Sequence, residues 1–184
     1  MLNGILPGRP LRLFFALWPD ASLRSALAAQ AKSLQDECGG RATAASNLHL
    51  TLAFLGDIDG ARLSELSRIA AEAANLAPFA LILERIGWWP RQHLVWAAPR
   101  DCPPGLQALV ETLAGSLRAA AFHAERRRFL PHVTLLRDVR CAPVALPCYL
   151  PLWRVSEFVL VASERSAGGA RYRVLGAWPL TRGL

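Results

Sequence analysis

The tripeptide His-x-Thr occurs twice in this chain, as His49-Leu50-Thr51 and as His132-Val133-Thr134, and each copy lies in a segment with strand-like character. Side chains two residues apart in a β-strand point to the same face, so each histidine shares a face with its threonine. Each copy follows a helical segment, and the two copies are 132 − 49 = 83 residues apart in a chain of 184. The sequence therefore predicts two similar lobes, derived from an ancient duplication, that each bring one histidine to a shared cleft.

Chance is a poor explanation for the repetition of this tripeptide. With four histidines and five threonines among 184 residues, two matches arise with a probability of roughly 6 × (5/184)², about one in two hundred. The other histidines, His93 and His123, lack the pattern. We expect them to be structural or exposed to solvent.

Hydropathy periodicity and turn-forming residues predict an α+β fold. Helices are expected from Asp20 to about Cys38, over residues 61–76, and from just after Pro104 to near Ala121. Strands are expected at residues 11–17, 47–55, 79–86, 93–97, 132–136, 158–162 and 172–175, with residues 87–92 connecting a hairpin and 141–151 forming a surface loop.

The length and the apolar content suit one domain. With 184 residues and 53% apolar composition, we expect residues 1–184 to form a single two-lobed domain, with residues 1–10 as a flexible N-terminal extension. The first ten residues lack the pattern of a secretory signal, and the apolar stretch 13–18 stops at Pro19-Asp20, far short of a bilayer span. We expect a cytoplasmic monomer with no membrane association and no obligate protein partner.

The cysteines indicate the redox state of the protein, and the net charge indicates the kind of substrate. Cys38, Cys102, Cys141 and Cys148 form no C-x-x-C pair and are expected to be reduced. The formal net charge is +7, and Lys32 is the single lysine, so the surplus is almost entirely arginine. Guanidinium groups suit a polyanionic substrate such as RNA, although an arginine-biased genome would give the same composition.

Two histidines and two threonines suffice for chemistry at a phosphate. Opening a cyclic phosphate needs a base for the attacking water and an acid for the departing ribose oxygen, and imidazoles titrate close to neutral pH. The threonine hydroxyls can donate to the phosphate oxygens as charge develops there. No metal is needed. A metal-dependent hydrolase would need a ligand set that the chain lacks, because Asp57 and Asp138 occupy turns beside the motif strands.

The segments Asn47-Leu-His-Leu-Thr-Leu-Ala-Phe-Leu-Gly56 and Pro131-His-Val-Thr-Leu-Leu-Arg-Asp138 resemble the two signature strands of a known family. This is the RNA 2′,3′-cyclic phosphodiesterase family, long called 2′-5′ RNA ligases, within the two-histidine phosphoesterases. Arg12-Leu-Phe-Phe-Ala16 and the segment from Tyr172 resemble its first and last strands, so the likeness spans residues 11–180.

The resemblance implies a bilobal, pseudo-two-fold α+β fold, with two mainly antiparallel sheets and flanking helices around a central cleft. It implies metal- and cofactor-free hydrolysis of an RNA-terminal 2′,3′-cyclic phosphate, or of a cyclic nucleotide, to a 2′-phosphomonoester. By similarity, His49 is the proton donor and His132 the proton acceptor, although pseudo-symmetry also allows the reverse order. Thr51 and Thr134 are expected to bind the phosphate.

Arg137 matches an arginine that the family places near the phosphate. Arg137 lies five residues after His132, and this odd offset places it on the same strand face as Val133. Arg137 therefore reaches the cleft only if the strand ends or bulges near Leu136. Otherwise we expect it to form a surface salt bridge.

Aromatic side chains and further arginines offer additional contacts to RNA. Phe14 and Phe15 belong to an apolar strand, and alternation must turn one of them away from the core; we assign Phe15 to substrate binding. Trp88-Trp89 could stack a base at the cleft rim. Arg126-Arg127-Arg128 is either a patch that steers RNA or a solvated turn.

Two alternatives remain open. The same cleft could belong to a non-catalytic RNA-binding module, although a pure binder has no use for a paired acid and base. The same site could also catalyse the reverse reaction, in which a ribose hydroxyl is the nucleophile and RNA ends are joined by a 2′-5′ linkage.

Overall fold

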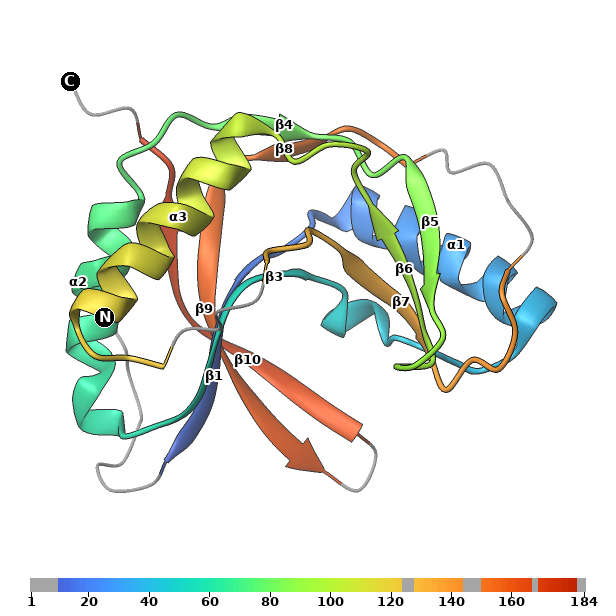
Figure 1. The fold of residues 1–184 in the computed structure, drawn as a ribbon, viewed down its shortest axis with the longest axis horizontal. Coiled ribbons are helices and arrows are strands. Elements are labelled where there is room, and N and C mark those ends of the chain that lie inside the picture. The colour runs from blue at the N-terminus through green and yellow to red at the C-terminus, as the bar shows by residue number, and fades with distance from the viewer. Residues whose placement is uncertain (1–9, 124–127, 144–149, 167–168, 182–184) are drawn as a thin grey trace.

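The computed structural model describes residues 10–123, 128–143, 150–166 and 169–181. It has an α+β fold, as predicted, with a large antiparallel sheet and a small second sheet (Figure 1). The α-helices of the described residues are α1 (Ala21–Cys38), α2 (Leu63–Ala73) and α3 (Pro104–Ala119). The large sheet has the strand order β10 (Gly169–Pro179), β9 (Glu157–Ser166), β1 (Leu11–Leu17), β3 (Leu50–Ile58), β7 (Val133–Arg137), β6 (Leu94–Ala98) and β5 (Arg85–Trp89), and β2 (Arg41–Ala42) pairs with β7. The small sheet joins β4 (Phe79–Leu81) to β8 (Trp153–Val155).

The large sheet consists of two halves that meet at one place. β3 and β7 pair through Leu50 and Val133, the middle residues of the two His-x-Thr tripeptides. The two tripeptides therefore face each other in antiparallel orientation about a local two-fold axis. α2 and α3 cover the half that contains β1 and β9, whereas α1 covers the half that contains β6 and β7 (Figure 1). The predicted bilobal architecture is confirmed, with both lobes sharing one continuous sheet.

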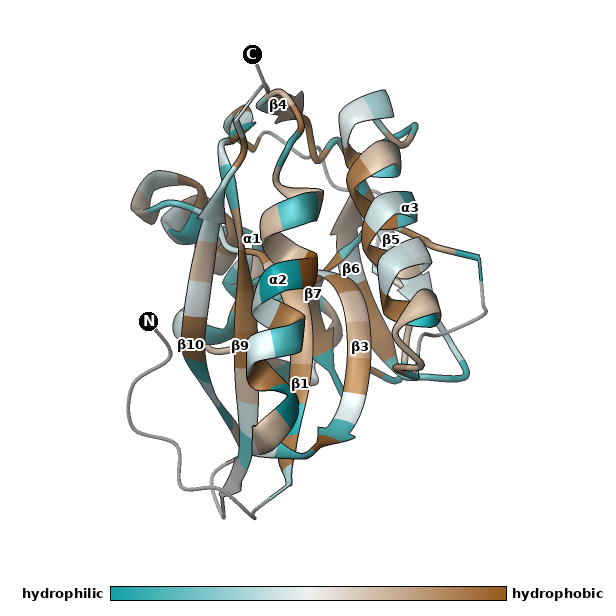
Figure 2. Cartoon of the chain, turned by 90° about the vertical axis from the view of Figure 1, so that its left-hand side faces the viewer, coloured by the Kyte–Doolittle hydropathy of each residue, from teal (hydrophilic) through white to brown (hydrophobic). Residues whose placement is uncertain are grey.

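An apolar core lies between the sheet and the helices. α1 shows the expected helical spacing of its buried side chains, which are Leu23, Leu27, Ala31, Leu34 and Cys38. Figure 2 shows the central strands as mainly hydrophobic and α2 as a mixture of hydrophobic and hydrophilic residues. On the opposite face of β1, Phe14 and Ala16 join a smaller cluster with Val159 and Val161 of β9. Both faces of β1 are thus apolar, which explains why its sequence reads as a continuous apolar run.

The first helix begins and ends where the sequence predicts. The Asp20 carboxylate accepts a hydrogen bond from the backbone N–H of Leu23 at 2.8 Å, which caps the first turn of α1. Gly39 follows the last residue with φ 68°, a backbone conformation that favours glycine, and donates its N–H to the carbonyl oxygen of Gln35 at 2.9 Å.

Several of the expected elements differ from the structure, and the strands expected at 158–162 and 172–175 are longer, as β9 and β10. The strand expected at 79–86 is two strands, β4 and β5, because β4 pairs with β8 in the small sheet. Gly87-Trp88-Trp89 belongs to β5 and not to the hairpin connection. The helix expected at 61–76 is a 3₁₀ turn (Gly60–Arg62) followed by α2. The pairing of β4 with β8 depends on a partner distant in sequence, which local periodicity cannot reveal.

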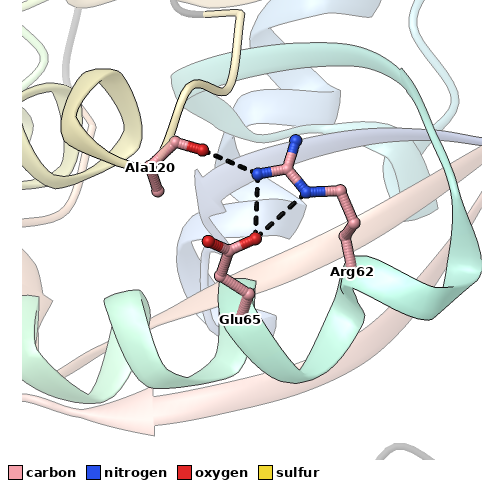
Figure 3. Close-up of polar contacts among 3 residues, drawn as sticks. All are labelled: Arg62, Glu65 and Ala120. Carbon is pink, nitrogen blue, oxygen red and sulfur yellow. Dashed lines mark hydrogen bonds and ion pairs between the residues drawn. The ribbon is translucent and has the colours of Figure 1, made fainter.

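Arg62 links the start of α2 to the end of α3 (Figure 3). Its Nη2 donates to the carbonyl oxygen of Ala120 at 2.7 Å and to Oε2 of Glu65 at 2.8 Å, and its guanidinium lies 3.6 Å from the centre of the Phe122 ring. The carbonyl after α3 therefore has a charged donor, which stabilises the packing of the two helices.

Several expectations concern residues outside the described ranges. These are the extension at residues 1–9, Arg126, Arg127, and the part of the predicted surface loop at 144–149, which includes Cys148. The helices that are described include none long and apolar enough to cross a membrane.

Candidate active site

A cavity of about 770 Å³ lies where the two halves of the sheet meet. The structure brings five of the six predicted site residues together in its wall: His49, Thr51, His132, Thr134 and Arg137. They come from two segments more than 80 residues apart, since His49 and His132 precede β3 and β7. The antiparallel pairing of these strands at Leu50 and Val133 is what places the two tripeptides side by side.

The two imidazoles are oriented in the same way. Nδ1 of His49 lies 2.6 Å from the carbonyl oxygen of Asn47, and Nδ1 of His132 lies 2.8 Å from that of Leu130. In both tripeptides, the residue that supplies this carbonyl oxygen lies two positions before the histidine. A carbonyl oxygen only accepts, so Nδ1 carries the proton and Nε2 is the nitrogen that is left for proton transfer. Nε2 of His49 lies 3.1 Å from the Thr51 hydroxyl oxygen.

Aromatic rings surround both imidazoles. Trp18 stacks on His49 with ring centroids 5.5 Å apart and 14° between the planes. Phe14 lies 4.9 Å from the same imidazole, and Tyr172 meets it edge-on at 5.2 Å. Trp89 meets His132 edge-on at 4.6 Å. These rings hold the imidazoles in place and remove water from their surroundings.

This burial changes the acidity of both histidines. The pKa of His49 is lowered from 6.5 to about 4, mainly by burial and to a smaller extent by the positive charges of Arg137 and His132, against the hydrogen bond to Asn47. Burial also lowers the pKa of His132, again with a contribution from Arg137. A phosphate anion beside the imidazoles would act in the opposite direction and favour a protonated ring.

Arg137 lines the cavity beside Thr134, although strict alternation would place it on the buried face of Val133. The pairing of β7 with β6 shifts its register by one residue between Thr134 and Leu136, which leaves Leu135 as an extra residue on β7. Leu135 and Leu136 are consequently both fully buried. This β-bulge returns Arg137 to the face of the cavity, as the sequence required for a contact with phosphate.

The structure corrects the prediction for Phe15. Phe15 is fully buried and packs edge-on against Phe158 and Trp178 in the main core, where no substrate can reach it. Phe14 is the residue of this strand that faces the cavity. Alternation along β1 allowed either phenylalanine to face the cavity. The helices pack on the face of the sheet where Phe15 lies, which leaves Phe14 on the cavity face.

The remaining candidates lie in different places. Trp89 contacts His132, whereas Trp88 packs against the core. Nδ1 of His93 lies 3.1 Å from the carbonyl oxygen of Val139 in a turn, which is the structural role expected for it. His123 is exposed to solvent, as is Arg128.

The cavity residues that were not predicted as site residues include Arg12, Arg41, Asn47 and Tyr172. The Arg12 guanidinium lies 4.8 Å from the centre of the Phe54 ring. The amide of Asn47 donates to the carbonyl oxygen of Ala170 at 2.7 Å, which links the segment before His49 to β10. The excess of arginine was the sequence signal for Arg12 and Arg41, which come from β1 and β2 and not from the motif strands.

The carboxylates near the motifs have other partners or face solvent. Arg41 forms an ion pair with Asp138 at 3.3 Å, and Asp57 is exposed. Within the described ranges, no three His, Cys, Asp or Glu side chains gather as ligands of a metal ion would.

Proton transfer on both sides of a phosphorus atom requires a proton donor and a proton acceptor in one cavity, with hydrogen-bond donors for the non-bridging oxygens between them. The pseudo-symmetric pair of His-x-Thr segments meets that requirement from two halves of one sheet. The fold and the site together define the class of two-histidine phosphoesterases.

Comparison with known proteins narrows this class to a family. The family model described as LigT like Phosphoesterase matches residues 17–96. RNA 2′,3′-cyclic phosphodiesterase of Escherichia coli (strain K12) is 36% identical over 174 residues, which cover 94% of this chain and 98% of that protein. The protein of the same name from Thermus thermophilus is 32% identical over 180 residues, covering 92% and 90%. The crystal structure of E. coli LigT complexed with 3′-AMP is similar with a TM-score of 0.86 at 37% identity, covering 94% of this chain and 99% of that one. The chain therefore belongs to the LigT-like RNA 2′,3′-cyclic phosphodiesterase family, as its resemblance predicted.

Proposed function

We propose that this protein hydrolyses the 2′,3′-cyclic phosphate at the end of an RNA to a 2′-phosphomonoester, without a metal ion or cofactor. The observation that carries the proposal is the matched orientation of His49 and His132 in one cavity, each with Nδ1 engaged by a backbone carbonyl and Nε2 left for proton transfer. The names of the relatives support the choice of substrate. The complex of E. coli LigT with 3′-AMP supports a nucleotide as the kind of ligand.

In the proposed mechanism, the two histidines act on opposite sides of phosphorus. Nε2 of neutral His132 accepts a proton from water as the water oxygen attacks phosphorus. The bond between phosphorus and O3′ breaks, and O3′ takes the proton from Nε2 of protonated His49. The phosphate stays on O2′, and proton exchange with solvent restores both imidazoles. Thr51, Thr134 and Arg137 stabilise the non-bridging oxygens.

The first test uses an RNA oligonucleotide with a 2′,3′-cyclic phosphate end. His49→Ala and His132→Ala should each lower kcat by about 10²- to 10⁴-fold, whereas His93→Ala should keep nearly full activity. EDTA should leave the wild-type rate unchanged, and the product should be the 2′-monoester. Three equally active variants, or loss of turnover in EDTA, would contradict the proposal.

The order of acid and base can be tested with a substrate in which sulfur replaces the 3′ oxygen. A thiolate leaves without a proton because its pKa is low. The analogue should therefore restore much of the rate of His49→Ala and little of that of His132→Ala. If the analogue instead restored the rate of His132→Ala, His132 would be the proton donor and His49 the proton acceptor.

Two variants of this proposal share the same cleft. RNA ligation would be the reverse reaction, with a ribose hydroxyl in place of water. A non-catalytic RNA-binding module would show tight binding and no product in a single-turnover assay with excess protein.

We further propose that residues 1–184 act as one two-lobed domain, and as a monomer in the cytoplasm. One apolar core that includes side chains from α1, α2 and α3 supports the single domain. Light scattering and cell fractionation test the monomer and the location.

A further inference from the structure

A second groove continues from the active-site cavity and takes no part in the mechanism above. Its volume is about 730 Å³, and Thr51, Phe54 and His132 line both spaces. It runs between α3 and the end of the β5–β6 hairpin, with β3 as its floor. A molecule bound at the histidines can therefore extend into the groove without crossing the core.

One wall of the groove is a face of α3. Gln107, Glu111, Ala114 and Arg118 follow one another at intervals of four, three and four residues, so they lie on one side of the helix. The Gln107 side-chain amide donates to the Glu111 carboxylate. Arg118 is exposed at the far end of this face.

Arg128, Phe129 and Leu130 also line the groove, and Trp89 lies at the hairpin end. Leu130 is 53% exposed, a large value for a leucine beside an active site. Arg118 and Arg128 have no ion-pair partner within the described residues, and Glu111 is the one carboxylate in this lining. The groove thus offers two guanidinium groups and several apolar surfaces. This is the chemistry of sites that bind single-stranded nucleic acid, where bases stack and phosphates meet cations.

The geometry of the substrate demands such a route. In an RNA with a 2′,3′-cyclic phosphate, the reacting ring closes the last ribose, and the rest of the strand continues from the 5′ carbon of that ribose. The terminal nucleotide occupies the cavity between the histidines, so the upstream strand has to leave it. We propose that the upstream strand lies in this second groove, with its phosphates at Arg118 and Arg128 and its bases against the apolar walls. The inference rests on the proposed function and makes oligonucleotides, not mononucleotides, the preferred substrates.

The test compares two substrates in one double variant. Arg118→Gln/Arg128→Gln should raise KM about tenfold for an RNA of about five nucleotides with a 2′,3′-cyclic phosphate end. The same variant should change KM for a nucleoside 2′,3′-cyclic monophosphate less than about twofold. The rise of KM with salt should also become less steep for the oligonucleotide.

A matched control removes the same charge elsewhere. Arg68→Gln/Arg100→Gln replaces two exposed arginines that pair with Glu72 and Glu84, and it should leave both substrates unaffected. Equal effects on the two substrates, or none on the oligonucleotide, would overturn the inference. A loss confined to the oligonucleotide in Arg12→Gln/Arg41→Gln would also overturn it, since the strand would then leave along β1 and β2.

Failure of the proposed function would look different, because wild-type protein would then hydrolyse neither substrate. The groove can still be tested in that case by binding. An RNA ending in a 2′-phosphate should bind wild-type protein more tightly than a nucleoside 2′-phosphate does, and Arg118→Gln/Arg128→Gln should abolish the difference. Equal affinities in wild-type protein would overturn the inference.

Discussion

His49 and His132 are chemically identical side chains whose surroundings decide their protonation. Three aromatic rings enclose His49, and its pKa falls to about 4 because burial disfavours the charged ring. His132 contacts the ring of Trp89, and its pKa is lowered as well. The Arg137 guanidinium lowers the pKa of both. At this scale the site combines a guanidinium charge with imidazoles whose neutral form is favoured near neutral pH.

These shifts predict the pH dependence of kcat/KM, which reports the free enzyme. The mechanism needs one protonated and one neutral imidazole, and both pKa values lie below 6.5, so kcat/KM should rise as the pH falls from 7 and peak on the acid side of 6.5. Arg137→Gln removes a positive charge, raises both pKa values and should move the optimum to higher pH. Its maximal rate should fall about 10- to 100-fold through the lost phosphate contact.

Arg41→Gln is the control for this experiment, because Arg41 lines the cavity without contributing to either shift. Its pH optimum should match that of wild-type protein. An optimum for Arg137→Gln that stays in place, or that moves to lower pH, would contradict the electrostatic account.

At the scale of elements, the local sequence pattern explains the regular parts of the strands. Tertiary contacts explain where a strand bulges or breaks. The expected boundaries of β1 and α1 agree with the structure, because apolar periodicity, an N-cap aspartate and a terminal glycine are local signals. The bulge in β7 and the division of residues 79–86 into β4 and β5 were not predictable in this way. Both result from pairing with strands far away in the sequence.

Two glycines should respond in opposite ways to alanine. A Cβ at Gly87 in β5 would lie 2.1 Å from a carbon of the Trp96 indole, so Gly87→Ala should destabilise the protein by about 1–3 kcal/mol. A Cβ at Gly115 in α3 meets nothing within 4 Å. Gly115→Ala should therefore stabilise the helix by about 0.5–1 kcal/mol. Urea unfolding measures both changes, and effects of equal sign would show that the packing at Gly87 is not as described.

At the scale of the whole molecule, the junction at Leu50 and Val133 makes one site from two lobes. The cavity wall includes residues of β1, β2, β3, β7 and β10, so no single lobe contains the site. The cost of this arrangement is that two imidazoles are partly buried where the lobes meet. Burial of groups that titrate near neutral pH couples the stability of the whole fold to pH.

This coupling gives a prediction for the free energy of unfolding. The pKa of His49 in the folded protein, about 4, lies below its unfolded value of 6.5, so the unfolded chain binds the proton first as the pH falls. Stability that is present above pH 6.5 is thus lost between pH 6.5 and 4. In His49→Gln the decline from pH 7 to pH 4 should be smaller by about 3 kcal/mol.

Urea unfolding at a series of pH values measures this difference. His123→Gln, which changes an exposed histidine, should keep the wild-type decline. Parallel curves for wild-type protein and His49→Gln would mean that His49 is not buried in its neutral form.

The sequence by itself determined the two His-x-Thr segments, the face that each histidine shares with its threonine, the α+β class and the family. These follow from alternation along a strand and from spacing along the chain, which are local properties. Only the tertiary structure decided that Phe14 and not Phe15 faces the cavity, that a bulge at Leu135 brings Arg137 to it, and that Arg12, Arg41 and Tyr172 join the site. The physical reason is that register, bulges and the choice of buried face are set by packing between elements, and that packing forms among residues far apart in the chain.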